Sequence, residues 1–216
     1  MIPDAVTEQA ERIRDLWMFS NTVALVVAAV VWGLVAFCVI RYRRRRDDEI
    51  PSQHGENIPI EILYTATPLA ILGLFFALTV GVQRDATATV DDPDVVIDVV
   101  AFQWQWQFRY PDDDVVVTGT YDEPPVMVLP VGQTARLNLD TPDVAHSFWV
   151  PDFLSKRDVL PDVENAIDVD VTEAGEWTGV CAEFCGLDHY KMQFGVRAVS
   201  ADEFEAWVDE QQERGT

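Results

Sequence analysis

The hydrophobic positions of this chain form long continuous runs in the first 90 residues and short alternating stretches after them. The first run, Leu16 to Ile40, has 25 residues and no charged side chain. As a helix it would be roughly 37 Å long, enough to cross a hydrocarbon layer of about 30 Å. The second run, Ile58 to Val82, has 25 residues and one charge, Glu61. The pattern predicts two membrane-spanning helices, at about 16–40 and 58–82.

The charges around the two runs predict their orientation. The segment before the first run is acidic, unlike the basic start of a cleaved signal peptide, so we expect the first run to remain as a spanning helix. Residues 41–46, between the runs, contain five arginines. Because positive loops stay on the cytoplasmic side, we expect this loop inside the cell and both ends of the chain outside it.

From residue 95 onward the pattern is that of short strands. The stretch 103–108 alternates strictly, which predicts Trp104, Trp106 and Phe108 on one face and three glutamines on the other. Turn residues rich in Pro, Gly and Asp separate the pieces, so we expect an antiparallel sandwich or barrel. The other predicted strands are 95–102, 115–118, 126–129, 134–139, 147–150, 166–171, 176–180 and 193–199.

The chain closes with a predicted short helix. Ser200 and Glu203 have the spacing of a capping box, and Phe204, Trp207 and Val208 then fall on one helical face. We therefore divide the chain into a two-span anchor with its N-terminal segment, residues 1–90, and an external all-β domain, residues 91–216.

The distribution of charge separates these two parts further. Residues 85–216 hold 28 Asp and Glu against 7 Lys and Arg, a net charge of −21, and the whole chain has −22. Lys156 and Lys191 are the only lysines. An acidic surface poor in lysine is typical of halophilic proteins, and an ordinary acidic extracellular domain is the alternative. Nucleic-acid binding is disfavoured because the external domain has no basic patch.

Chemistry-bearing residues gather near the end of the predicted sandwich. Cys181, Cys185, His189 and Met192 stand within twelve residues between two predicted strands, and His146 is available upstream. Thiolate and thioether sulfurs are soft ligands that suit copper. A structural zinc site normally has paired histidines, whereas His146 lies 35 residues before Cys181. A Cys181–Cys185 disulfide is permitted outside the cell but leaves the His and Met spacing unexplained. Cys38, in the first run, is expected to be a simple apolar residue.

The number of ligands favours two metal ions. A mononuclear blue-copper site uses one thiolate, and this segment offers two. If both thiolates bridge two copper ions, each ion also receives one imidazole, from His146 or His189, and one weak ligand. We expect Met192 and a backbone carbonyl of the loop as the weak ligands.

These residues resemble a known family, subunit II of haem-copper cytochrome c oxidases. The family pattern Cys-x-Glu-x-Cys-Gly-x-x-His-x-x-Met is present in full at 181–192, and Asp-Val-x-His-Ser-Phe is present at 143–148. The two spans, the tryptophan-rich strand and the Leu-Pro-Val-Gly turn at 129–132 extend the similarity over most of the chain. The resemblance implies a two-helix transmembrane hairpin followed by a cupredoxin-like Greek-key sandwich with a short C-terminal helix.

The resemblance also implies roles for individual residues. The ligands of a binuclear copper centre, CuA, would be His146, Cys181, Cys185, His189 and Met192 through side chains and Glu183 through its backbone carbonyl. The Glu183 carboxylate would bind a magnesium ion at the boundary with subunit I. Trp104 would accept electrons from the donor. Glu61, which could equally sit in contact with water at the membrane interface, would mark the entrance of a proton path.

The function implied is electron transfer in a membrane complex. A soluble donor, either cytochrome c or a small blue-copper protein, would reduce CuA, and haem in subunit I would receive the electrons and reduce oxygen to water. One alternative is a membrane-tethered copper-delivery protein. Another is the CuA subunit of a nitric oxide reductase. A quinol-oxidase subunit or a purely structural anchor is disfavoured because every copper ligand is present.

Overall fold

The structure is a computed structural model that describes residues 3–43, 53, 55–120 and 122–215. These residues form two compact units. One unit is Asp15–Gln83, and the other combines the segment up to Arg14 with the chain from Arg84 onward. Arginines 44–46 of the predicted cytoplasmic loop lie outside the described residues.

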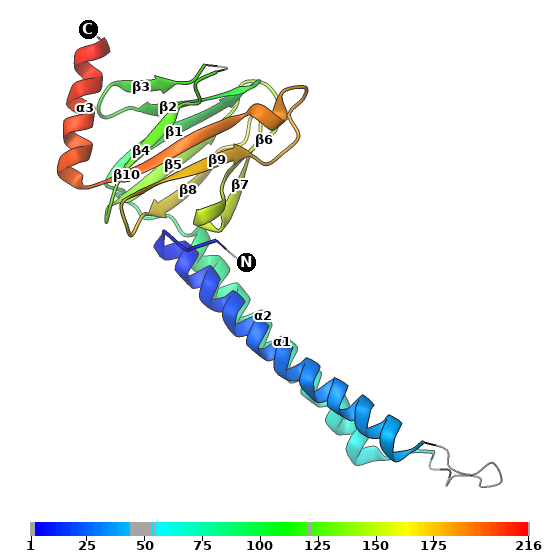
Figure 1. The fold of residues 1–216 in the computed structure, drawn as a ribbon. Coiled ribbons are helices and arrows are strands. Elements are labelled where there is room, and N and C mark those ends of the chain that lie inside the picture. Colours follow the sequence, from blue (N-terminus) through cyan, green and yellow to red (C-terminus); the bar gives the residue numbers. More distant parts are fainter. Residues whose placement is uncertain (1–2, 44–52, 54, 121, 216) are drawn as a thin grey trace. The chain divides into compact units, whose positions relative to one another are not determined.

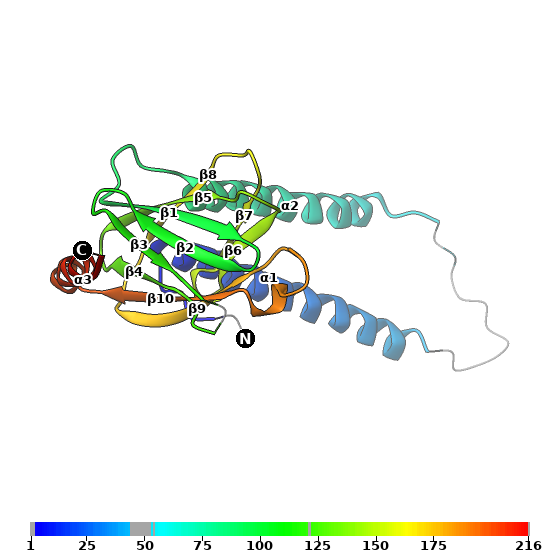
Figure 2. The same cartoon turned by 90° about the horizontal axis from the view of Figure 1, so that it is seen from above.

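The first unit consists of the apolar parts of helices α1 (Glu8–Arg41) and α2 (Ile58–Thr87), which are packed side by side (Figures 1 and 2). The rings of Phe19 and Phe75 meet across the pair with centroids 5.8 Å apart. Most apolar side chains of the helices are exposed; Trp32 is 71% exposed. Both helices are long and apolar enough to span a membrane, where lipid would cover these side chains.

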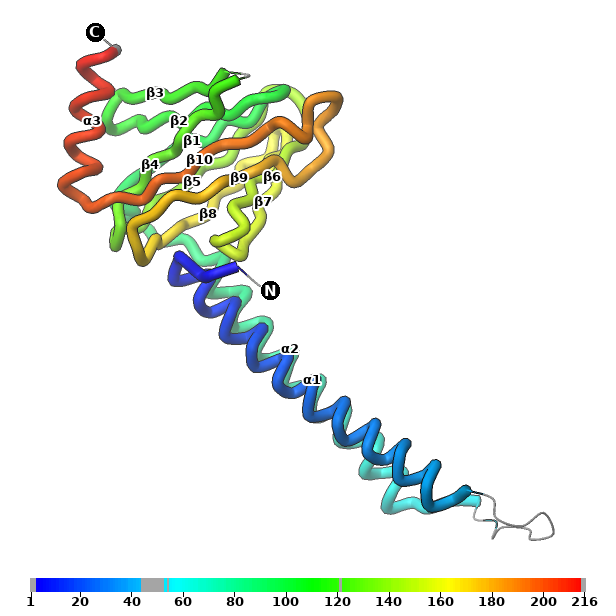
Figure 3. Tube along the Cα trace, viewed as in Figure 1, coloured from blue at the N-terminus to red at the C-terminus, as the bar shows by residue number. Residues whose placement is uncertain are grey.

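The second unit is a β-sandwich with one helix at its edge (Figures 1 and 3). One sheet has the order β3-β2-β1-β5-β8 and the other the order β4-β10-β9-β6-β7. The elements are β1 (Val95–Phe102), β2 (Gln105–Tyr110), β3 (Val115–Thr118), β4 (Val126–Pro130), β5 (Thr134–Asp140), β6 (His146–Val150), η1 (Pro151–Phe153), β7 (Ser155–Val159), β8 (Asn165–Asp170), β9 (Gly175–Cys181), η2 (His189–Lys191), β10 (Gln193–Val199) and α3 (Ala201–Gly215).

Strand pairing corrects one expectation. Most neighbouring strands are antiparallel, but β1 pairs with β5 and β4 pairs with β10 in parallel. The purely antiparallel sandwich that we expected is therefore wrong for these two pairs. The reason lies in the connections: β4 crosses to the other sheet, so β5 returns beside β1 running in the same direction.

The N-terminal segment packs on the sandwich. Thr7 pairs with Val171, and the amide N–H of Thr172 donates to the carbonyl of Val6 at 3.0 Å. Val6 is buried. The Thr7 hydroxyl also accepts a hydrogen bond from the amide of Ala10 and so caps α1. These contacts explain why residues before Asp15 belong to the β unit.

An aromatic cluster fills the space between the sheets. Trp106 of β2 contacts Phe148 and Phe194, with ring centroids 6.0 and 4.9 Å away. Phe148 stacks on Phe194 at 4.8 Å, and Phe108 lies edge-on to Phe194 at 5.6 Å. Trp106 and Phe108 are fully buried, as their alternation predicted. Trp104 lies in the turn before β2, where it is half-buried and packs against this core.

Helix α3 confirms the predicted capping box. The amide of Glu203 donates to the Ser200 hydroxyl, and the Glu203 carboxylate accepts from the Ser200 amide at 3.0 Å. Its apolar face buries Phe204, Trp207 and Val208. Trp207 contacts Tyr110 with ring centroids 5.1 Å apart, so α3 covers one end of the core.

Tyr110 provides a test of how the edge strand β4 is held. Its buried hydroxyl donates to the carbonyl of Val128 at 3.0 Å and accepts from the Val128 amide at 2.9 Å. Replacing Tyr110 with Phe leaves both backbone groups without this partner, so we expect a loss of about 2 kcal/mol in the free energy of unfolding. Urea unfolding of the detergent-solubilised chain, followed by tryptophan fluorescence, measures this loss. Tyr190→Phe is the control because Tyr190 is 70% exposed; equal midpoints for the two variants would contradict the prediction.

Candidate metal centre

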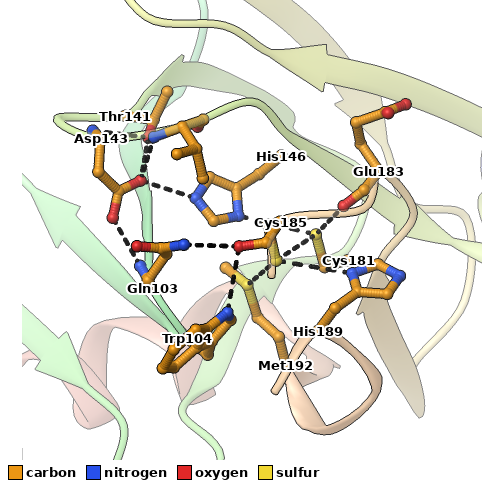
Figure 4. A network of polar contacts seen from close by, with 11 residues as sticks. Gln103, Trp104, Thr141, Asp143, His146, Cys181, Glu183, Cys185, His189 and Met192 are labelled. Carbon is orange, nitrogen blue, oxygen red and sulfur yellow. Dashed lines mark hydrogen bonds and ion pairs between the residues drawn. The ribbon is translucent and has the colours of Figure 1, made fainter. Parts of the chain in front are cut away.

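Three segments of the sandwich bring the candidate ligands together (Figure 4). His146 begins β6, after the segment that follows β5. Cys181 ends β9, and the loop to β10 carries the remaining ligands through η2 to Met192. The turn between β1 and β2 supplies Gln103 and Trp104. The structure therefore brings together His146 and Met192, which lie 46 positions apart in the sequence.

The Cys185 sulfur is the hub of the cluster. It lies 3.8 Å from the Cys181 sulfur, 3.6 Å from Nδ1 of His189 and 3.7 Å from the Met192 sulfur. The Cys181 sulfur in turn lies 3.8 Å from Nδ1 of His146 and donates to the backbone carbonyl of Glu183 at 3.2 Å. Each thiol is therefore paired with one imidazole nitrogen and one weaker donor.

These separations fit a metal site. Ligand atoms bonded to a first-row metal at about 2.0–2.3 Å with tetrahedral angles lie about 3.3–3.8 Å from one another. The two sulfurs are too far apart for a disulfide, whose S–S bond is about 2.05 Å, and both cysteines are free thiols. His146, Cys181 and Cys185 are buried and form a potential metal-binding group within the described residues. Thiolate, imidazole and thioether donors together fit copper.

Asp143 determines which nitrogen of His146 faces the cluster. Its carboxylate lies 2.9 Å from Nε2 of His146, and an ionised carboxylate only accepts hydrogen bonds. Nε2 therefore carries a proton, so a metal ion would be bound through Nδ1, which points at the Cys181 sulfur. A histidine that ligates a metal through one nitrogen is commonly held in this way through the other.

The surroundings of the two thiols shift their pKa values in opposite directions. Burial raises the pKa of Cys181, but hydrogen bonding to His146 and to nearby backbone groups outweighs it and lowers this pKa below its usual value. Burial and the charge on Cys181 raise the pKa of Cys185. Partial burial likewise opposes ionisation of Asp143, yet the N–H of Gln103 and the imidazole of His146 lower its pKa. A metal ion would supply the charge that stabilises both thiolates.

A further carbonyl links the cluster to the β1–β2 turn. The indole N–H of Trp104 donates to the backbone carbonyl of Cys185 at 3.2 Å, and the side-chain amide of Gln103 donates to the same oxygen at 2.7 Å. Our sequence interpretation missed Gln103 and gave no role to Asp143. The position of Asp143, three residues before His146, is the one local signal that could have indicated it.

Two other predicted site residues have different surroundings. The side chain of Glu183 is exposed, so its carboxylate lies outside the buried cluster. Only its backbone carbonyl belongs to the cluster. Glu61 lies in the first turn of α2, in the helical unit, where its carboxylate accepts a hydrogen bond from the Asn57 amide at 2.9 Å. The Asn57 side chain caps the same helix by accepting from the Ile60 amide.

Comparison with known proteins identifies the family. The sequence model described as cytochrome c oxidase subunit II, periplasmic domain, matches residues 95–199, and the model of its transmembrane domain matches residues 1–80. The probable cytochrome c oxidase subunit 2 of Nocardia farcinica is 36% identical over 273 aligned positions, covering 96% of this chain and 73% of that protein. This chain belongs to the cytochrome c oxidase subunit II family. It is a membrane protein with two spanning helices.

Other members of the subunit II family agree in sequence and fold. The probable subunit 2 of Streptomyces coelicolor is 34% identical, with 99% of this chain and 79% of that protein covered. The crystal structure of the periplasmic domain of subunit II (CoxB) of Bradyrhizobium japonicum superposes with a TM-score of 0.54 at 29% identity, covering 58% of this chain and 99% of that one. The predicted cupredoxin-like sandwich after two apolar helices is confirmed.

Proposed function

We propose that this chain is the electron-accepting subunit of a terminal haem-copper oxidase. It would take single electrons from a soluble donor at a binuclear copper centre and pass them to haem in subunit I, where oxygen is reduced to water. The observation that supports this most directly is the pairing of two buried thiols 3.8 Å apart, each with its own imidazole nitrogen.

The residues of the cluster would bind the two ions in different ways. Cys181 and Cys185 would bridge them, His146 and His189 would each bind one through Nδ1, and Met192 and the Glu183 carbonyl would be the weak ligands. When bound, the copper ions would supply one-electron redox chemistry. The buried side chains of His146, Cys185 and Met192 exclude water from the site, and a dry, fixed ligand set keeps reorganisation small.

Trp104 is the residue through which we expect electrons to arrive. Its indole is half-buried and is hydrogen-bonded to the carbonyl of Cys185, so it reaches from the surface to a proposed copper ligand. The donor would be cytochrome c or a small blue-copper protein. If the source is halophilic, steering by the net charge of −21 over residues 85–216 is screened beyond about 3 Å at 1 M salt, and docking depends on short-range contacts.

The placement in the membrane follows from the arginine run. Arg41 and Arg43 are described residues of the 41–46 stretch and would lie on the cytoplasmic side, with residues 91–216 as the external copper domain and residues 1–90 as the anchor. The exposed Glu183 carboxylate would bind magnesium where subunit I docks. Glu61 would lie near the entrance of a proton path, at the cytoplasmic start of α2.

Electron paramagnetic resonance of the copper-loaded, detergent-solubilised chain tests the binuclear centre. We expect one unpaired electron coupled equally to two copper nuclei, with two copper ions bound per chain. Coupling to a single nucleus would reject the proposal, and one weakly held cuprous ion would favour copper delivery. Reconstitution with the haem-binding partner, followed by oxygen and nitric oxide consumption, distinguishes an oxidase from a nitric oxide reductase.

Replacing Trp104 with Leu should slow electron uptake without emptying the centre. The variant loses the indole contact to Cys185 but no proposed ligand. We expect the rate of reduction by the donor to fall on the order of tenfold or more, a barrier increase of at least about 1.4 kcal/mol. Stopped-flow reduction with each candidate donor, at several salt concentrations, measures it. Trp149→Leu, which removes a tryptophan that is 37% exposed on β6, is the control; equal rates in the two variants would exclude this role for Trp104.

A further inference from the structure

Gln103 contacts both segments that carry the proposed copper ligands (Figure 4). Its backbone N–H donates to Oδ2 of Asp143 at 2.7 Å, and its side-chain amide donates to the carbonyl of Cys185 at 2.7 Å. The first contact joins it to the segment before β6, and the second joins it to the loop between β9 and β10. One residue of the β1–β2 turn thus bridges two parts of the chain that are far apart in sequence.

The contact to Asp143 continues to a proposed ligand. The other oxygen of this carboxylate, Oδ1, is 2.9 Å from Nε2 of His146, whose side chain is fully buried. Asp143 also accepts hydrogen bonds from the Thr141 hydroxyl and the Val144 amide, which fix its orientation. A displacement of Gln103 would therefore reach His146 through a single carboxylate.

The loop between β9 and β10 comes close to the side chain of Gln103 at Gly186. Gly186, directly after Cys185, has φ of 122°, a conformation that favours glycine. A Cβ atom at this position would lie 3.0 Å from Nε2 of Gln103 and 3.2 Å from the Trp104 ring. The loop approaches Gln103 and Trp104 as closely as a glycine allows, which brings the Cys185 carbonyl within reach of both donors.

We propose that Gln103 is a positioning residue that clamps the 181–192 loop to the 141–146 segment and so arranges the ligands before metal binds. This inference rests on the proposed copper function, which it extends to a residue outside the ligand set. Without the amide of Gln103, the Cys185 carbonyl keeps only the longer bond from Trp104. Losing a hydrogen bond that orients a metal ligand typically weakens metal binding by 10–100-fold, so we expect copper affinity to fall by about tenfold or more.

The test compares Gln103→Met, which is close in size but lacks the amide, with Gln107→Met in the same full-length chain in detergent. Gln107 is a glutamine of β2 whose amide bonds to Thr118, away from the loop. Hydrogen exchange of the metal-free proteins should be faster in residues 185–192 of Gln103→Met alone. Copper affinity, measured by competition with a chelator, should fall in the same variant, and its paramagnetic resonance spectrum should change.

The outcomes separate the clamp from the copper function. If the unaltered chain does not bind two copper ions, the proposed function fails, but exchange in the metal-free proteins still decides the role of Gln103. Unchanged exchange and copper affinity in Gln103→Met would overturn the clamp. Faster exchange throughout the sandwich would also overturn it, because the residue would then act on global stability. Faster exchange confined to the loop supports it.

Discussion

Replacing Cys185 with Ser should reduce the copper content of the full-length chain from two ions to one or none. The Cys185 sulfur contacts the Cys181 sulfur, Nδ1 of His189 and the Met192 sulfur. Its loss removes one of the two proposed bridging thiolates and the atom that His189 and Met192 both contact. A hydroxyl is a harder and far less acidic ligand than a thiol and does not replace the soft thiolate that copper prefers. Metal analysis and paramagnetic resonance of the loaded protein measure the change.

Cys38→Ser is the matched control for this prediction. Cys38 is an exposed cysteine of α1 in the helical unit, so its replacement changes the thiol count of the chain without touching the cluster. We expect this variant to bind two copper ions. Two equivalent copper nuclei in Cys185→Ser would contradict the bridging role. Loss of copper from both variants would indicate that replacing either cysteine lowers the copper content, whether or not the cysteine belongs to the cluster.

Short apolar stretches bounded by turn residues predicted several strands correctly. The stretches 95–102, 115–118 and 193–199 match β1, β3 and β10 at both ends. Strand β7 was not predicted, because three of its five residues are Lys156, Arg157 and Asp158. It forms at the sheet edge through backbone pairing with β6, and such pairing leaves no hydrophobic pattern to detect.

Most of the cluster of proposed ligands was predictable because its spacing is local. Four side chains of the cluster lie within one twelve-residue loop, and the soft donors indicate copper. The polar contacts of Trp104 were not predictable from alternation, since that pattern only assigns it to the face of Trp106 and Phe108. Its indole N–H and the Gln103 amide donate to the carbonyl of Cys185, 81 and 82 residues away. Contacts at this separation depend on how the strands assemble.

A substitution at Gly179 of β9, in the packing between the two sheets, should have the second large effect, a loss of stability. A Cβ atom on this residue would lie only 2.0 Å from Cζ of Phe194. Phe194 cannot move aside, because Phe148 stacks on it at 4.8 Å and Trp106 lies 4.9 Å away. We therefore expect Gly179→Ala to lower the free energy of unfolding by about 3 kcal/mol, at the upper end for an overpacked core. Urea unfolding of the detergent-solubilised chain measures it.

Gly195 of β10 offers the control, since it lies in the same sheet on the neighbouring strand and faces outward. A Cβ atom there would approach only the side chain of Val126, at 3.0 Å, and that side chain is exposed and can adjust. We expect Gly195→Ala to change the free energy of unfolding by less than about 1 kcal/mol. Because Gly179 lies two residues before Cys181, the strain in Gly179→Ala should also disturb the cluster and reduce copper binding. A Gly179→Ala chain as stable as Gly195→Ala would show that the aromatic cluster repacks to accept the added methyl group.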